Sequence, residues 1–168
     1  MASLPIQQLK STLGAGARSN KFKIIVPSPV GIDMQTITTL VKSTSLPTKS
    51  FMDIETYIHG KKINIAGDIT FQDTWTCSFL DTEDHSLRTG FDNWMKYIDT
   101  FQNVRSAGSP MDYMTDIIIQ QLSTINNTPT KTYTLKYAYP KELGSVSFDQ
   151  SNPELISFDV TFKFSYWE

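Results

Sequence analysis

Apolar and polar side chains alternate along several parts of the chain, which is typical of β-strands with one buried face. The clearest alternation covers residues 156–166, where six apolar side chains occupy every second position. Residues 71–79 and 133–139 alternate in the same way, although Asp73 interrupts the apolar face of the first of these segments. These segments predict a protein that is built mainly from β-strands.

The period of the apolar residues changes after residue 81. Five apolar side chains now recur three or four positions apart, which places them on one side of an α-helix. They are Leu87, Phe91, Trp94, Ile98 and Phe101. Asp81 or Thr82 can cap the first turn, and Glu83 and Asp84 suit the positive end of the helix dipole. The sequence therefore predicts a helix over residues 82–103.

Residues 49–66 predict a long β-hairpin. Apolar residues alternate on both sides of the segment Ile58-His59-Gly60-Lys61, in which Gly60 can adopt the positive φ of a tight turn. A pair of strands has too little core to be stable alone in water. We therefore expect something else to cover this extended hairpin.

Weaker patterns occupy the rest of the chain. Residues 1–20 indicate a short helix or an arm, and residues 105–115 a loop. Strands are expected at 22–26, 34–46 and 117–119, and a further alternation covers residues 145–149.

The length of 168 residues suits a single domain, residues 1–168. The patterns together predict a mainly β fold of two packed antiparallel sheets, a β-sandwich or split barrel, with one flanking α-helix and the extended hairpin. The residues expected in the core are Phe71, Trp75, Cys77, Phe79, Leu87, Phe91, Trp94, Ile98, Phe158, Val160, Phe162 and Phe164.

The charges are few and unevenly distributed. Lys and Arg number 15 against 17 Asp and Glu, so the net charge is -2 and no basic excess marks a nucleic-acid-binding protein. Residues 1–66 hold 8 basic and 3 acidic side chains, whereas residues 67–168 hold 7 and 14. Head-to-tail self-association could use this difference, and chance placement on a solvated surface is the alternative.

The single cysteine, Cys77, excludes an internal disulfide and fits a protein made in a reducing cytoplasm. No apolar run approaches the length of a membrane span, and the first residues lack the basic and apolar regions of a secretory signal. We therefore expect no membrane partner.

Few residues offer catalytic chemistry. The histidines, His59 and His85, lie outside any motif that pairs a nucleophile with a base. Cys77 lies between Trp75 and Phe79 on an apolar face, which favours a buried structural thiol. Residues 14–18 lack the third glycine of a dinucleotide-binding motif, and no metal-ligand spacing occurs. The sequence favours a protein that is not an enzyme and has no cofactor or metal.

Hydroxyl groups dominate the polar faces of the expected strands. The chain has three arginines and no basic and aromatic cluster that could grip nucleic acid. A surface along which DNA slides would instead carry neutral hydroxyls or a mild negative charge. The ordinary solvated face of a sheet is the alternative interpretation. The residues concerned are Thr74, Thr76, Ser78, Thr132, Thr134, Ser145, Ser147, Ser157, Asp159, Thr161 and Ser165.

Several short segments occur in a characteristic order along the chain. The first three are ARSNKF at 17–22, STSLP at 43–47 and KINIAGD at 62–68, the last of which leads into Thr74-Trp75-Thr76. They are followed by FDNW at 91–94, FDVTF at 158–162 and YWE at 166–168. This ordered set resembles the tail tube proteins of contractile-tailed bacteriophages (myoviruses) over nearly the whole chain.

The resemblance implies a structural virion protein, located in the tail after assembly in the bacterial host cytoplasm. Hexameric rings of such subunits stack into an inner tail tube that conducts DNA from capsid to host. The implied partners are further copies of the chain, a tail sheath protein outside, a tape measure protein and double-stranded DNA in the lumen without sequence-specific binding, and a baseplate tube initiator. Joining several subunits into a continuous ring barrel would remove the unpaired edges of a small sheet.

Two surfaces acquire expected roles from this resemblance. The hydroxyl-bearing faces are candidates for lining the lumen. Stacking requires a second heterologous contact, for which the hairpin and the uneven charge are candidates. The expected ring–ring residues are Glu55, Tyr57, His59, Gly60, Lys61 and Lys62.

Other interpretations stay open at this stage. The family includes tube initiators, which are baseplate-proximal paralogues, and relatives such as the haemolysin-coregulated protein of type VI secretion. From another class, a small-ligand carrier could be built on a closed β-barrel, because alternating apolar faces can line a cavity.

Overall fold

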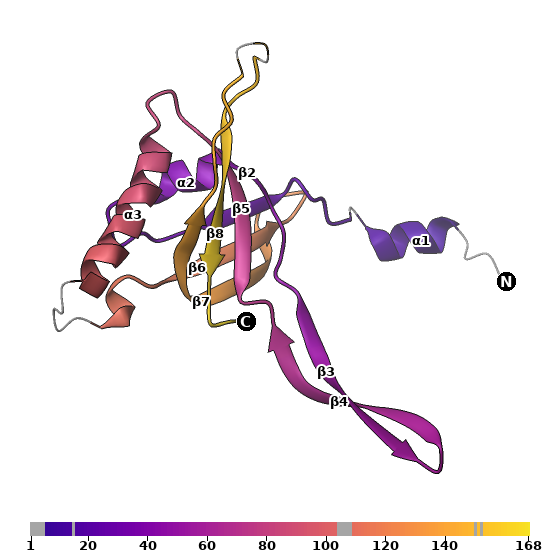
Figure 1. Ribbon diagram of the computed structural model, residues 1–168. Helices are drawn as coiled ribbons and strands as arrows, with labels where there is room; N and C mark the ends of the chain where they lie inside the picture. The colour runs from indigo at the N-terminus through magenta and orange to yellow at the C-terminus, as the bar shows by residue number, and fades with distance from the viewer. Residues whose placement is uncertain (1–5, 15, 104–108, 150, 152) are drawn as a thin grey trace.

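A computed structural model describes residues 6–14, 16–103, 109–149, 151 and 153–168 (Figure 1). The helices are α1 (Ile6–Leu13), α2 (Met34–Leu40) and α3 (Ser86–Asn103), and a 3-10 turn covers Pro110–Asp112. The strands are β1 (Phe22–Ile25), β2 (Val41–Thr44), β3 (Lys49–Ile58), β4 (Lys61–Phe71), β5 (Thr74–Leu80), β6 (Thr115–Leu122), β7 (Pro129–Leu143), β8 (Ser157–Lys163) and β9 (Tyr166–Trp167). The expected mainly β class is confirmed.

One long strand joins the two halves of the main sheet. The strand order is β1-β6-β7-β8-β5-β2, with β9 beside β7, and the paired strands are antiparallel. β7 pairs with β6 up to Ala138 and with β8 from Tyr139 onward. Tyr137, next to this change of partner, has a φ of 56° and interrupts the alternation between the buried residues Leu135 and Ala138. The strand is thus irregular where the two antiparallel halves meet.

The hydrophobic core lies between the sheet and α3, which packs beside it (Figure 1). The ring of Phe91 on α3 lies 5.3 Å from Phe79 on β5 and 6.0 Å from Phe162 on β8. Trp94 Nε1 donates a hydrogen bond to the backbone oxygen of Tyr113, at 3.1 Å. The indole can therefore be buried without leaving its N–H group unsatisfied.

Most of the side chains expected in the core are buried. They are Trp75, Cys77, Phe79, Leu87, Phe91, Trp94, Phe158, Val160, Phe162 and Phe164. Ile98 is partly buried against the same cluster, and the side chain of Phe71 lies outside the described part of the structure. The half of the sheet that contains β1, β6 and β7 adds Ile24, Ile117, Ile119, Leu135 and Ala138 to the cluster.

The expected strand at 34–46 is wrong for its first part, which forms α2 before β2 begins. The Asp33 carboxylate caps this helix by accepting hydrogen bonds from Thr36 N at 2.9 Å and Thr36 Oγ1 at 2.7 Å. Thr38 Oγ1 donates to the backbone oxygen of Met34, and Ile37 is buried. Capping and burial of one isoleucine therefore override the β preference of a threonine-rich segment.

α3 begins at Ser86, four residues later than expected from the sequence. Residues 82–85 form a turn instead, in which His85 has a φ of 52° and donates its N–H to the backbone oxygen of Thr82. Thr82 Oγ1 and Asp84 Oδ1 accept hydrogen bonds from Ser86 N, so the turn caps the helix.

Candidate assembly surfaces

The β3–β4 hairpin extends away from the rest of the molecule (Figure 1). Pairing places Ile54 opposite Ile65 and Thr56 opposite Ile63. Because successive side chains of a strand point to opposite faces, these four residues line one face of the hairpin. Ile54 is 54% exposed and Ile65 is 51% exposed. The hairpin thus presents an apolar face that the described part of the subunit leaves uncovered.

A bulge interrupts the hairpin ladder between Phe51 and Asp53. Gly67 lies next to this bulge, where an added Cβ would come within 2.8 Å of the backbone oxygen of Met52. A side chain at position 67 would therefore force the strands apart. This close approach gives a physical reason for the glycine in the segment KINIAGD.

The outer end of the hairpin carries the residues expected at a ring–ring contact. His59 and Gly60 have φ values of 50° and 75°, which is the backbone of a tight hairpin turn. Lys62 forms an ion pair with Glu55 across the strands. Tyr57 lies opposite Lys62, and Lys61 lies opposite Ile58. The structure therefore brings Glu55, Tyr57, His59, Gly60, Lys61 and Lys62 together.

β5 and β8 share a face that carries hydroxyl groups. Thr76 Oγ1 lies 3.1 Å from Thr161 Oγ1, and the Ser78 hydroxyl donates a hydrogen bond to the Asp159 carboxylate. Lys163, opposite Thr74, forms an ion pair with Asp73 at 3.1 Å. Its hydrogen bond and positive charge lower the pKa of the Asp73 carboxyl. This face is polar, with its charges partly paired to one another.

Of the other expected lumen residues, Thr132, Thr134 and Ser165 lie outside strands β5 and β8. Thr132 and Thr134 lie on β7, opposite Gln120 and Ile118 in the other half of the sheet. Ser157 begins β8 opposite Leu80, and by strand alternation it lies on the same face as Asp159 and Thr161. Ser165 follows β8 and donates its N–H to the backbone oxygen of Lys136 at 3.0 Å.

Ser145 and Ser147 belong to no strand, because residues 144–149 have no regular secondary structure. The strand pattern at 145–149 was therefore misleading. Gly144 N donates to the backbone oxygen of Asp159 at 2.7 Å, and the chain then leaves the sheet. The alternation of Val146 and Phe148 does not reflect a buried face, since Phe148 is exposed.

β1 and β2 form the two ends of the main strand path. Each pairs with one neighbour, β6 or β5, and no other strand of the described chain covers its outer side. Such an edge offers N–H and C=O groups to a further strand. The subunit therefore has a free edge at each end of its sheet.

The nucleophilic and basic side chains do not meet. His59 is at the hairpin tip, whereas His85 Nδ1 lies 2.6 Å from the buried carboxylate of Asp81 at the start of α3. Cys77 is fully buried, and burial raises the pKa of its thiol to about 12. Within the described residues, no group of His, Cys, Asp and Glu side chains is arranged to hold a metal ion.

We expect the Cys77 thiol to resist alkylation in the folded protein. A pKa of about 12 leaves very little thiolate at pH 8, and the reactive thiolate fraction should rise only as the pH approaches that value. Labelling by iodoacetamide at pH 8 should be at least ~100-fold slower in native protein than in urea-unfolded protein. Equal labelling rates in the two states would contradict this prediction.

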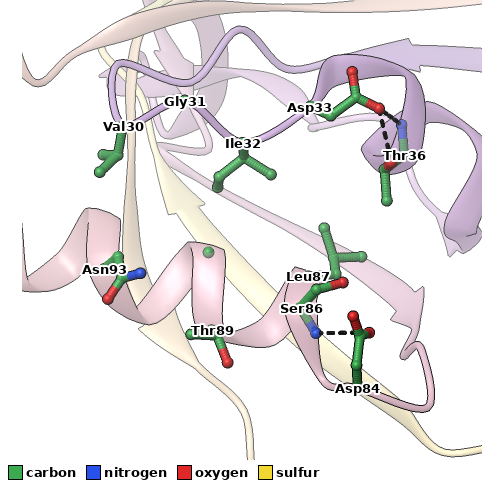
Figure 2. A pocket seen from close by; sticks show the side chains of 11 residues that line it. Val30, Gly31, Ile32, Asp33, Thr36, Asp84, Ser86, Leu87, Thr89 and Asn93 are labelled. Atoms are coloured by element: carbon green, nitrogen blue, oxygen red, sulfur yellow. Dashed lines mark hydrogen bonds between the residues drawn. The ribbon is translucent and has the colours of Figure 1, made fainter.

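A cavity of about 450 Å³ lies between the Val30–Asp33 turn and α3 (Figure 2). Its carboxylates are already engaged: Asp33 binds Thr36, and Asp84 accepts a hydrogen bond from Ser86 N at 3.3 Å. Hydrogen bonds from Thr36 lower the pKa of the Asp33 carboxyl, and hydrogen bonds from Thr82 and Ser86 lower that of Asp84. The polar groups of this cavity therefore cap α2 and α3.

Residues 15–168 match the family described as Phage tail tube protein. The chain belongs to the phage tail tube protein family. It is therefore a structural component of a phage tail, and the family expected from the ordered segments is confirmed. None of the described helices of this tail tube protein is long and apolar enough to cross a membrane.

Curated relatives cover most of the length of this family member. It is 33% identical to the tail tube protein gp19 of Enterobacteria phage T4 over 156 residues, 92% of the chain and 93% of that protein. It is 25% identical to the tail tube protein of Serratia phage KSP90 over 142 residues, 82% of the chain and 79% of that protein.

Solved structures share the fold of this tail tube protein. A chain of the anti-feeding prophage baseplate matches with a TM-score of 0.62 and 14% identity over 99% of this chain and 96% of that chain. A second match is a chain of the PVC sheath–tube complex, an extracellular contractile injection system in its extended state. Its TM-score is 0.60 and its sequence identity 14%, over 99% of this chain and 97% of that chain.

Sequence analysis of this tail tube protein missed one exposed apolar site. Phe148 and Leu155, in the β7–β8 loop, are 76% and 75% exposed. Ile6 and Leu13 of α1 are also exposed, on a helix that lies apart from the sheet (Figure 1). A proline such as Pro153 is typical of a loop, but sequence alone does not show whether a loop folds back onto the core.

Proposed function

We propose that this subunit forms hexameric rings that stack into the inner tube of a contractile phage tail, through which DNA leaves the capsid. The observation that carries the proposal is the uncovered apolar face of the β3–β4 hairpin, at Ile54, Ile63 and Ile65. Apolar surface of this kind is typical of an obligate interface between subunits. In this proposal the protein has a mechanical role and no catalytic one, and residues 1–168 act as one tube domain.

Ring closure would use the two free edges of the sheet. β1 and β2 lie at opposite ends of the strand path, so the β1 edge of one subunit can approach the β2 edge of the next. A heterologous contact that repeats around an axis closes into a ring. Closure would join the sheets into a continuous barrel and satisfy the unpaired backbone groups of both edges.

The further partners in this proposal are a sheath outside the tube, a tape measure protein and DNA inside it, and a baseplate initiator at its end. Support comes from the structural neighbours, which include a sheath–tube complex, a baseplate and a tube-terminating cap. The hydroxyl face of β5 and β8 is the preferred lumen surface, since it lacks a cluster of unpaired basic groups that would hold phosphate.

Negative-stain electron microscopy of the purified protein tests the proposal. Hollow tubes built from stacked six-fold rings are expected at micromolar concentration, together with a large mass in light scattering. A subunit that stays monomeric or dimeric at every concentration and binds an apolar dye would overturn the proposal in favour of a small-ligand carrier. A protein that forms single rings without stacking would instead indicate a terminal or initiating ring.

We expect the substitution Thr161→Arg to permit tube assembly but to slow DNA release severalfold. Thr161 lies in the middle of the hydroxyl face, beside Thr76, and an arginine there would bind passing phosphates. The measurement is the rate of DNA release from virions that carry the variant, with Thr161→Ser as the control that keeps a hydroxyl group. An unchanged release rate in the arginine variant would contradict the proposal that this face lines the lumen.

A further inference from the structure

The β7–β8 loop and the hairpin tip lie at opposite ends of the subunit. In Figure 1 the loop projects at the top of the view, whereas the hairpin tip lies at the bottom. The two sites therefore cannot meet within one subunit. They can meet between two copies that are stacked in the same orientation.

The loop has a partly apolar and acidic surface. Phe148 and Leu155 are 76% and 75% exposed, and they flank a cavity of about 390 Å³ that Asp149 and Glu154 also line. Residues 144–157 contain no lysine, arginine or histidine. We refer to Phe148, Asp149, Glu154 and Leu155 as the loop surface.

The loop surface keeps its negative charge available. The Asp149 carboxylate accepts hydrogen bonds from Ser151 N at 2.9 Å and Ser151 Oγ at 2.6 Å, which lower the pKa of this carboxyl. Glu154 forms no ion pair with any residue in the described part of the chain. Asp149 and Glu154 are both exposed, so the loop surface presents two acidic side chains to the solvent.

The hairpin tip has the complementary character. Residues 56–63 contain two lysines and one histidine and no acid. Tyr57 and Ile58 are 69% and 51% exposed, so apolar surface lies beside these basic groups. Lys61 forms no ion pair within the described residues, whereas Lys62 pairs with Glu55. We refer to Tyr57, Ile58, Lys61 and Lys62 as the tip surface.

We propose that the tip surface of one subunit binds the loop surface of a second copy in the adjacent ring. The proposal rests on the proposed function and names the receptor for the hairpin. Contact would remove the exposed rings and aliphatic side chains from water and place the lysines beside Asp149 and Glu154. Because the contact joins two different surfaces, it repeats along an axis and gives every ring the same polarity.

Charge reversal provides the test. One variant carries Lys61→Glu with Lys62→Glu, and a second carries Asp149→Lys with Glu154→Lys. Each alone would place like charges across the contact, so we expect the assembled fraction in sedimentation to fall at least ~10-fold at low salt. Since salt screens such repulsion, part of the loss should be recovered at ~1 M NaCl.

Mixing the two variants makes the test specific. The acidic tip of the first variant fits the basic loop of the second, and the basic tip of the second fits the acidic loop of the first. An equimolar mixture is therefore expected to assemble, with rings of the two variants alternating. The four substitutions combined in one chain should restore assembly in the same way.

Two controls separate this contact from general effects. Lys96→Glu reverses a charge on α3, where Lys96 pairs with Asp92, and should assemble normally. Asp149→Asn keeps a side-chain acceptor for Ser151 and should weaken assembly less than the reversed pair. If wild-type protein forms tubes but the charge-reversed variants also assemble normally, the tip–loop contact is overturned and the proposed function stands. The same conclusion follows if the two variants fail to assemble when they are mixed. Absence of tubes from wild-type protein would instead overturn the proposed function.

Discussion

The Phe162→Ala variant is expected to lose about 3–5 kcal/mol of unfolding free energy. Phe162 is fully buried, and its ring centroid lies 5.4 Å from Trp75, 6.0 Å from Phe91 and 6.3 Å from Trp94. Truncation would remove the side chain that joins β5 to α3 and leave a cavity that large rigid rings cannot fill easily. Urea unfolding of the dispersed subunit, followed by tryptophan fluorescence, measures the loss.

Phe148→Ala is the matched control for this experiment. The same chemical change is made at a side chain that is 76% exposed in the β7–β8 loop, so unfolding free energy should change by less than about 0.5 kcal/mol. A loss of similar size in both variants would contradict the placement of Phe162 in the core. The contrast depends on burial, since the two residues are identical.

Shortening the hairpin is expected to abolish long tubes while leaving the subunit folded. Removal of residues 55–58 and 61–64 keeps the His59–Gly60 turn and connects it directly to Ile54 and Ile65, which already face each other. The deletion removes the outer end of the apolar face, which belongs to none of the core contacts around α3. Ring stacking would lose its contact, whereas the main sheet would keep its own.

Two measurements are needed for this variant. Circular dichroism and thermal unfolding should match those of the dispersed wild-type subunit within a few degrees. Electron microscopy should show no tubes, or rings that do not stack. If the shortened protein forms tubes of normal length, the hairpin does not form the ring–ring contact.

The sequence predicted those elements whose side chains face two different environments. β5 and β8 each have one face against α3 and one polar face, so the alternation from Trp75 to Phe79 and from Phe158 to Phe162 is visible without any structure. The helix period was equally clear, because its apolar side packs on the same core. The hairpin was predicted from its turn and alternation, and its length was underestimated at the Phe71 end.

The remaining features depend on contacts between distant residues. α2 was missed because its threonines favour strands locally, whereas the Asp33 cap and the buried Ile37 favour a helix. The proximity of Thr76 to Thr161 follows from the register of β5 and β8, which a single sequence does not specify. The exposure of the Phe148 ring was also not predicted, because the alternation of Val146 and Phe148 with serines resembles that of a strand.

The order of the strands along the main sheet determines how the subunit would respond to tension. A sideways load that enters at β1 and leaves at β2 crosses every ladder of the strand path in series. Of the two outermost ladders, the one between β2 and β5 has three registered pairs and the one between β1 and β6 has four, whereas β5 and β8 share seven. Under excessive load β2 would therefore separate from β5 first, while the aromatic core between the sheet and α3 stays packed. The strand could then pair again without global unfolding of the subunit.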